Sequence, residues 1–183
     1  KNSSSAMFTE SDELVFGYTK FYDLAKHFNP NFEKSLMIGG AAYSYPKHYL
    51  EKYPEALIDV VEIDPALTEL AKECFHLEEN PRLRIFHEDG RTFLNTTTEK
   101  YDVIFGDAFK AYFSIPYQLT TRESIQKMYD ALNKDGLILI NVASSLEGEK
   151  SEFFRAQYHT FKKVFPQVLT FAVYYPEKGE LTQ

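Results

Sequence analysis

Short apolar runs alternate with longer amphipathic segments along this chain, and this alternation predicts the secondary structure. We predict strands at residues 36–40, 57–64, 83–89, 101–107, 137–142 and 168–175. We predict helices at residues 14–28, 45–52, 65–75, 90–94 and 149–164, and a further helix that Thr120 or Thr121 caps and Gly136 terminates. Strands that alternate with helices are typical of a mainly parallel sheet with helices on both faces, so we predict a doubly wound α/β domain.

Composition narrows the class of protein. The 183 residues suffice for one domain, and a 44% share of hydrophobic residues fits a globular fold. The net charge of −7 and the lack of a Lys/Arg cluster argue against a nucleic-acid partner, whereas an acidic surface suits a small cationic substrate. The single cysteine, Cys74, excludes an intramolecular disulfide and indicates a reducing compartment, so we expect a cytoplasmic protein in which Cys74 is a buried hydrophobe. No apolar stretch reaches the ~18–20 residues that a membrane span requires, and we expect no membrane partner.

A glycine pair and a later acid form the most informative motif. Gly39 and Gly40 end the first predicted strand, and Glu62 follows 23 positions after Gly39, at the end of the second. Glycines at this turn let the backbone approach a ligand, and an acid about 20 residues further on binds the ribose of a nucleoside cofactor in Rossmann-like folds. An ordinary turn with a solvent-exposed acid is the structural alternative. A nicotinamide-dependent oxidoreductase is a functional alternative, although residues 41–44 lack the further glycine of its motif.

Three of the first four predicted strands end in an acid, and ligands bind at the carboxyl ends of strands in such sheets. The predicted ligand-contacting residues at these ends are Gly39, Gly40, Glu62, Ile63, Asp89, Gly90, Asp107 and Ala108. We expect Asp89 to accept a hydrogen bond from an adenine amino group, and Asp107 to attract a sulfonium or an amine. No histidine or cysteine pair has metal-ligand spacing, so we expect no metal.

Several stretches resemble the spermidine/spermine synthase family, which has the class I S-adenosylmethionine-dependent methyltransferase fold. They read S-L-M-I-G-G-A-A-Y-S-Y-P-K-H-Y-L, V-V-E-I-D-P-A-L-T-E-L-A-K, N-P-R-L-R-I-F-H-E-D-G-R-T-F-L and K-Y-D-V-I-F-G-D-A-F. The resemblance implies that S-adenosylmethionine or its decarboxylated form is the co-substrate. It also implies that Glu62 binds the ribose, Asp89 and Gly90 hold the adenine, Gly39 and Gly40 line the amino-acid or aminopropyl end, and Asp107 lies at the donor carbon. An amine acceptor is the implied second partner, and a homodimer is left open.

The chain also departs from the family pattern. Ala42 stands where the family has an acid in G-G-G-D-G-G, Tyr43 replaces a glycine, and Lys110 replaces the second acid of D-S-S-D. Aminopropyl transfer, methyl transfer and a non-catalytic binding or assembly module therefore remain open. Residues 1–13 are expected to be a linker or a remnant of the family's N-terminal β-region. Residues 14–183 are expected to form the nucleoside-binding domain, with a last strand left open beyond the end of the chain.

Overall fold

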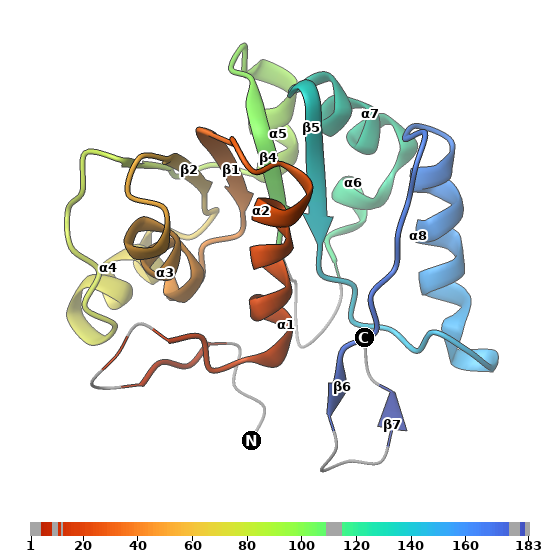
Figure 1. Cartoon of the computed structure of the whole chain (residues 1–183), viewed down its shortest axis with the longest axis horizontal. Coiled ribbons are helices and arrows are strands. Elements are labelled where there is room, and N and C mark those ends of the chain that lie inside the picture. The colour runs from red at the N-terminus through yellow and green to blue at the C-terminus, as the bar shows by residue number, and fades with distance from the viewer. Residues whose placement is uncertain (1–4, 9–10, 12, 109–114, 176–179, 182–183) are drawn as a thin grey trace.

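The computed structural model describes residues 5–8, 11, 13–108, 115–175 and 180–181. Five of its strands form a parallel sheet in the order β3-β2-β1-β4-β5 (Figure 1). These strands are β1 (Lys34–Ile38), β2 (Leu57–Val61), β3 (Leu83–Phe86), β4 (Tyr101–Gly106) and β5 (Leu132–Ile140). Helical segments connect and flank them: α1 (Gly17–Lys20), a 3-10 turn (Phe21–Asp23), α2 (Leu24–Phe28), α3 (Ser44–Lys52), α4 (Pro65–Cys74), α5 (Gly90–Thr96), α6 (Tyr117–Thr120), α7 (Arg122–Asp130), a second 3-10 turn (Glu149–Ser151) and α8 (Glu152–Lys162).

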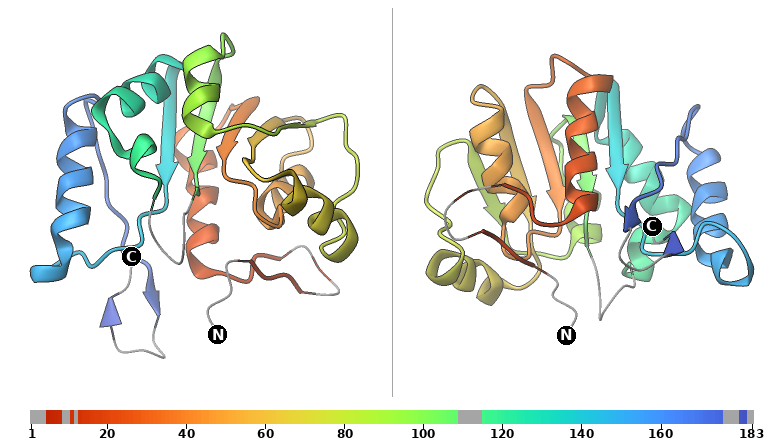
Figure 2. Two further views of the ribbon diagram at one scale, coloured as in Figure 1. Left: turned by 180° about the vertical axis from the view of Figure 1, so that it is seen from behind. Right: turned by 60° about the horizontal axis from the view of Figure 1, so that its bottom comes forward.

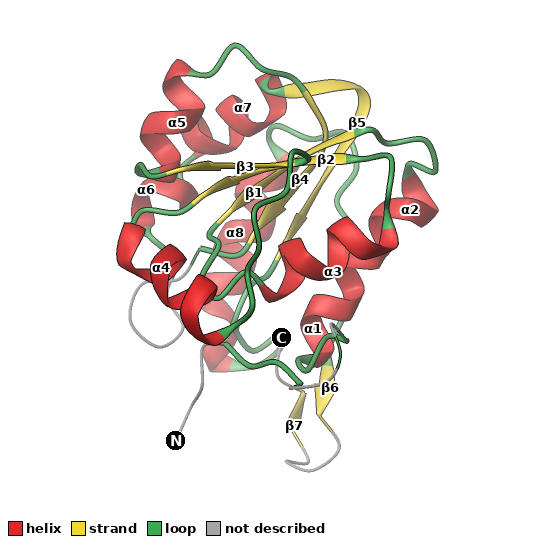
Figure 3. Ribbon diagram, turned by 90° about the vertical axis from the view of Figure 1, so that its left-hand side faces the viewer, coloured by secondary structure: helices red, strands yellow, loops and turns green. Residues whose placement is uncertain are grey.

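Helices cover both faces of the sheet, as the views from behind and from the side show (Figures 2 and 3). The two faces have separate apolar cores because successive residues of a strand point to opposite sides. In β1, Met37 packs into the core that includes residues of α1 to α4, whereas Leu36 and Ile38 pack into the core that includes residues of α5 to α7. The prediction of a doubly wound α/β fold is therefore confirmed.

The strand order reverses between β1 and β4, and this point brings the predicted ligand-contacting ends together. β1 pairs in parallel with β2 on one side and with β4 on the other. The amide of Gly39 donates to the Val61 carbonyl, and the amide of Asp107 donates to the Ile38 carbonyl, each at 2.9 Å. Ligands of doubly wound sheets bind at such a reversal, so the topology supports the predicted location of the site.

The fifth strand differs from its prediction because it begins before Gly136. Leu132 pairs with Tyr101, but the next pair joins Leu137 to Val103, so β5 carries extra residues at this point. Asp135 adopts a left-handed φ of 63° inside this irregularity. Gly136 therefore lies within an irregular strand and does not terminate the preceding helix, which ends at Asp130.

The predicted sixth strand at residues 168–175 is wrong for most of its length. Only Tyr174–Tyr175 form a strand, β6, which pairs antiparallel with β7 (Glu180–Leu181) in a separate two-stranded sheet. The preceding apolar residues pack through their side chains instead. Phe171 contacts the rings of Phe21 and Phe28, both with centroids 6.3 Å away. An apolar run of this kind can bury surface against helices without joining a sheet, which periodicity alone does not distinguish.

Cys74, expected to be buried, is exposed at the end of α4, so that prediction is wrong. Within the described part of the chain, every helix is too short or too polar to cross a membrane.

Candidate functional site

The turn after β1 passes very close to the end of β4, and Gly39 makes this approach possible. Its φ is +96°, and a Cβ at this position would lie 2.6 Å from the carbonyl oxygen of Asp107 and 2.9 Å from the Cα of Ala108. Any other residue would collide with this backbone. The sequence predicts that a glycine lets the backbone approach a ligand here. In the structure, Gly39 first of all lets the turn approach the backbone at the end of β4.

Glu62 holds the same turn from the other side. Its carboxylate accepts hydrogen bonds from the amides of Gly40 and Ala41 through Oε2, both at 2.9 Å, and from the amide of Asp64 through Oε1, at 3.0 Å. Glu62 is only 5% exposed, so the alternative of a solvent-exposed acid is wrong. A carboxylate has about four acceptor positions, and three are filled by backbone. One position on Oε1 remains for a ligand hydroxyl, and the ribose role of Glu62 stays a prediction.

Asp89 caps helix α5 and keeps part of its carboxylate for other donors. Oδ1 accepts from the amides of Arg91 and Thr92 at 2.9 and 3.1 Å, as an N-cap residue does. Oδ2 accepts from Nε2 of Gln118 at 3.1 Å. Gly90 follows in a tight space, because a Cβ there would lie 2.7 Å from Cγ2 of Ile38. Asp89 and Gly90 therefore lie beside the end of β1, as their predicted role requires.

Asp107 lies in a different environment at the end of β4. Its Oδ2 accepts from the Tyr18 hydroxyl and its Oδ1 from Nδ2 of Asn141, both at 3.2 Å. Although the residue as a whole is only half-buried, its carboxyl is surrounded by side chains. This burial raises the pKa of Asp107 to about 6, while hydrogen bonds from Asn141, Tyr18 and Tyr22 stabilise the charged form and limit the rise. A carboxyl with this pKa exchanges a proton near neutral pH.

Sequence reasoning missed Tyr18 and Asn141. Asn141 directly follows β5, so the rule that strand ends carry ligand-contacting residues could have found it, had the strand end been predicted correctly. Tyr18 lies 89 positions from Asp107 and reaches it only through the packing of α1. No local signal in the sequence indicates that contact.

The remaining predicted residues take varied positions around this edge. Ile63 is 65% exposed, and Ala108 is half-buried against the core next to α5 and α7. Ala42 is nearly buried, and the Tyr43 ring is fully buried, so close to Gly40 that a Cβ there would lie 2.9 Å from the ring. Lys110 lies outside the described residues.

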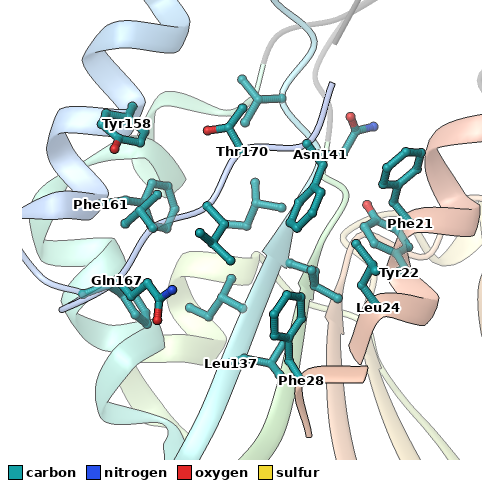
Figure 4. A pocket seen from close by; sticks show the side chains of 18 of the residues that line it. Phe21, Tyr22, Leu24, Phe28, Leu137, Asn141, Tyr158, Phe161, Gln167 and Thr170 are labelled. Carbon is teal, nitrogen blue, oxygen red and sulfur yellow. The ribbon is translucent and has the colours of Figure 1, made fainter. Parts of the chain in front are cut away.

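A cavity that is separate from these strand ends lies beside β5 rather than at the β1/β4 reversal. Its volume is about 800 Å³, and aromatic and aliphatic side chains from α2, α8 and the segment 165–173 dominate its lining (Figure 4). Three of the lining residues, Tyr18, Tyr22 and Asn141, also surround the carboxyl of Asp107. Among the described residues, none of the predicted glycine and acid positions lines this cavity. The described residues also include no group of three His, Cys, Asp or Glu side chains that could hold a metal ion.

Comparisons with known proteins show to which family the chain is related. A polyamine aminopropyltransferase of Vibrio vulnificus is 29% identical over 167 residues, which are 90% of this chain and 54% of that protein. Its counterpart from Streptococcus pneumoniae serotype 4 is 31% identical over 166 residues, covering 87% of this chain and 57% of that protein. This chain therefore spans a little over half the length of these relatives.

Solved structures give the same fold. A spermidine synthase crystallised with the transition state analogue AdoDATO is 26% identical, has a TM-score of 0.69, and covers 88% of this chain and 55% of its own. Human methyltransferase-like protein 13 in complex with SAH is 21% identical with a TM-score of 0.68, over 91% of this chain and 74% of its own, a likeness of fold alone. The spermine/spermidine synthase domain matches residues 16–182. This chain therefore belongs to the spermine/spermidine synthase family.

Proposed function

We propose that this chain is the nucleoside-binding domain of an aminopropyltransferase-like enzyme that uses decarboxylated S-adenosylmethionine and an amine. The observation that carries the proposal is the position of Asp107, a carboxyl with a pKa of about 6 that lies against Gly39 at the reversal of strand order. A general base works best when its pKa lies near the operating pH. The names of the relatives, polyamine aminopropyltransferases, support the same reaction class.

The donor would lie along the carboxyl ends of β3, β2, β1 and β4. Asp89 and Gly90 would hold the adenine, and Glu62 would accept a ribose hydroxyl with its remaining acceptor position. The neutral backbone at Gly39 and Gly40 would lie along the aminopropyl group that is attached to the sulfonium of the donor. Ile63 and Ala108 would complete the contacts, because they directly follow Glu62 and Asp107.

The reaction is a substitution at carbon. The nitrogen of the amine attacks the carbon next to the sulfonium, the carbon–sulfur bond breaks, and its electron pair stays on sulfur as a thioether nucleoside. The amine proton passes to the carboxylate of Asp107, directly or through water. The hydrogen bonds from Tyr18 and Asn141 fix the orientation of that carboxylate, so the enzyme contributes mainly alignment and a proton acceptor.

Two alternatives rest on particular residues. Methyl transfer would use the same donor site, with the methyl carbon of S-adenosylmethionine as the reacting atom. A non-catalytic module is favoured by Ala42 and Lys110, which stand where the family has acids.

A thermal-shift panel separates these functions. The panel comprises S-adenosylmethionine, its decarboxylated form, 5′-methylthioadenosine and NAD, each against the full chain. We expect stabilisation by the decarboxylated donor and by methylthioadenosine, because ligands that bind only the folded state raise the melting temperature. A preference for S-adenosylmethionine would favour methyl transfer, a response to NAD alone would favour an oxidoreductase, and no response to any of the four would contradict the proposal.

A further inference from the structure

We propose that Gln118 is a second base-reading residue, which together with Asp89 selects a 6-aminopurine over a 6-oxopurine. This inference rests on the proposed nucleoside function and adds a specificity-determining side chain to it. Gln118 belongs to α6, after the β4 connection, and its Nε2 donates to Oδ2 of Asp89 at 3.1 Å. The bond joins two strand-to-helix connections that are 29 residues apart in the chain.

The orientation of the Gln118 amide follows from its partner. An ionised carboxylate only accepts hydrogen bonds, so the NH₂ end of the amide must face Asp89. The NH₂ group has a second hydrogen, and the amide oxygen lies at its other end. Because Oδ1 of Asp89 is filled by two helix amides, Oδ2 is the oxygen that can also accept from a ligand. The pair thus presents an acceptor, Oδ2, next to a donor, the second Nε2 hydrogen.

The backbone that carries Gln118 is held firmly against the predicted adenine position. Leu119, the next residue, is 7% exposed and packs in the core beside α5. A Cβ on Gly90 would lie 3.7 Å from both terminal methyl groups of Leu119, so the two connections are in contact. The Leu119 amide donates to the Pro116 carbonyl at 2.8 Å, which fixes the start of α6. Gln118 is therefore positioned by packing and not only by its bond to Asp89.

An acceptor next to a donor complements adenine. The exocyclic amine of adenine donates and its ring N1 accepts, so Oδ2 of Asp89 and Nε2 of Gln118 can satisfy both. Hypoxanthine has a carbonyl in place of the exocyclic amine and an N–H in place of the bare N1. Its carbonyl would face the acceptor Oδ2 of Asp89, and its N–H would face the donor Nε2 of Gln118. Sites built on such pairs reject the mismatched partner because buried polar groups are left without hydrogen bonds.

The test is titration calorimetry with 5′-methylthioadenosine and 5′-methylthioinosine, which differ only at the 6-position and N1. We expect the wild-type protein to prefer the adenine compound by at least tenfold. Gln118→Met keeps the length of the side chain but removes its hydrogen-bonding groups, and we expect it to reduce this preference at least fivefold. The matched control is Gln126→Met, because Gln126 donates to Asp130 at 2.9 Å on the exposed side of α7, and we expect it to keep the wild-type ratio.

The ratio of the two affinities separates reading of the base from support of the fold. Equal weakening of both compounds in Gln118→Met would show a structural role and overturn the inference. Wild-type affinity for both compounds in Gln118→Met would overturn it too, and would leave the proposed function standing. A wild-type preference below fivefold would overturn it without any variant, so the test does not depend on how well Gln118→Met folds. A wild-type protein that binds neither compound would contradict both the inference and the proposed function.

Discussion

The acids that end β2 and β4 are neighbours of the same glycine turn, yet the protein holds them in different ways. Glu62 accepts three backbone amides at 2.9–3.0 Å, from the turn and from its own loop. Asp107 accepts from two side chains at 3.2 Å, and burial raises its pKa to about 6. Backbone donors cannot leave without unfolding the turn, whereas side-chain donors can be exchanged for a ligand. The comparison indicates that Glu62 shapes the turn through backbone hydrogen bonds, and that the carboxyl of Asp107 has the environment that its proposed role as a proton acceptor needs.

The largest effect should come from removing the base. Asp107→Asn keeps the shape of the side chain and one acceptor oxygen for the donors Tyr18 and Asn141, but it cannot accept a proton near neutral pH. We expect aminopropyl transfer to fall by roughly 10²–10⁴-fold, the usual contribution of general base catalysis. The affinity for methylthioadenosine should change less than threefold. The measurement is product formation from the decarboxylated donor and an amine.

The pH profile sharpens this test. Because the base must be deprotonated, the wild-type rate should rise as pH passes through about 6 and then level off. Asp107→Asn should lose that limb. Asp102→Asn is the control, since Asp102 also belongs to β4 but binds the amides of Glu33 and Lys34 at the opposite end of the strand. A wild-type limb that persists in Asp107→Asn would assign the base to another group.

Glu62→Ala should show the next largest effect, on binding rather than on the chemical step. The substitution removes the acceptor for three backbone amides and the proposed ribose contact. We expect methylthioadenosine to bind at least tenfold more weakly by calorimetry, since ~1.4 kcal/mol corresponds to a factor of ten. Glu69→Ala is the control, because Glu69 is exposed on α4 and pairs only with Lys72 among the contacts described. Wild-type affinity in Glu62→Ala would remove Glu62 from the binding site.

The two departures from the family pattern should limit the acceptor. Ala42 and Lys110 leave Asp107 without the further acids that a polyamine cation would meet in the family. We expect weak or no transfer to putrescine by the unmodified chain, and an increase of about tenfold in the double variant Ala42→Asp, Lys110→Asp. The assay is spermidine formation. Robust turnover by the unmodified chain would show that another acid, such as Asp64 or Glu88, replaces the missing ones.

The smallest effect concerns stability. A carboxyl whose pKa is raised on folding favours the folded state at low pH and loses that contribution as pH rises through its folded pKa. For Asp107 the loss spans about pH 4 to pH 6. Asp107→Asn should therefore raise the free energy of unfolding at pH 7–8 by roughly 1–3 kcal/mol relative to its effect at pH 4. Urea denaturation at both pH values measures this difference, and a variant that is no more stabilised at pH 7 than at pH 4 would show that the buried charge is already offset.

The sequence predicts most of the fold because its strands are continuous apolar runs. The predicted range 57–64 contains all of β2, and the range 36–40 contains the last three residues of β1, each with the acid or glycine that follows the strand. The carboxyl ends of these strands could therefore be located within a few residues. The start of the fifth strand could not be predicted, because a glycine such as Gly136 is typical of a helix end. In the structure, Gly136 instead follows Asp135, which takes a left-handed conformation inside β5. Residues 168–173 look like a strand but pack through Phe171 against Phe21 and Phe28.

The site shows the same division between local and tertiary information. Glu62 and Asp89 could be found because each acid follows an apolar run at the expected spacing. Tyr18 and Gln118 could not, because their partners lie 89 and 29 residues away and are reached only after the helices pack. Spacing therefore predicts which acids lie at the strand ends, whereas the side chains that contact those acids depend on the completed fold.

A crystal structure of the full chain with 5′-methylthioadenosine tests the central claim most directly. The account predicts adenine at Asp89 and Gly90, a ribose hydroxyl on Oε1 of Glu62, and the sulfur beside Gly39 and Asp107. The competing location is the β5 cavity, because its volume of about 800 Å³ can hold a small ligand. A nucleoside bound in that cavity, with the ends of β1 to β4 unoccupied, would contradict the account.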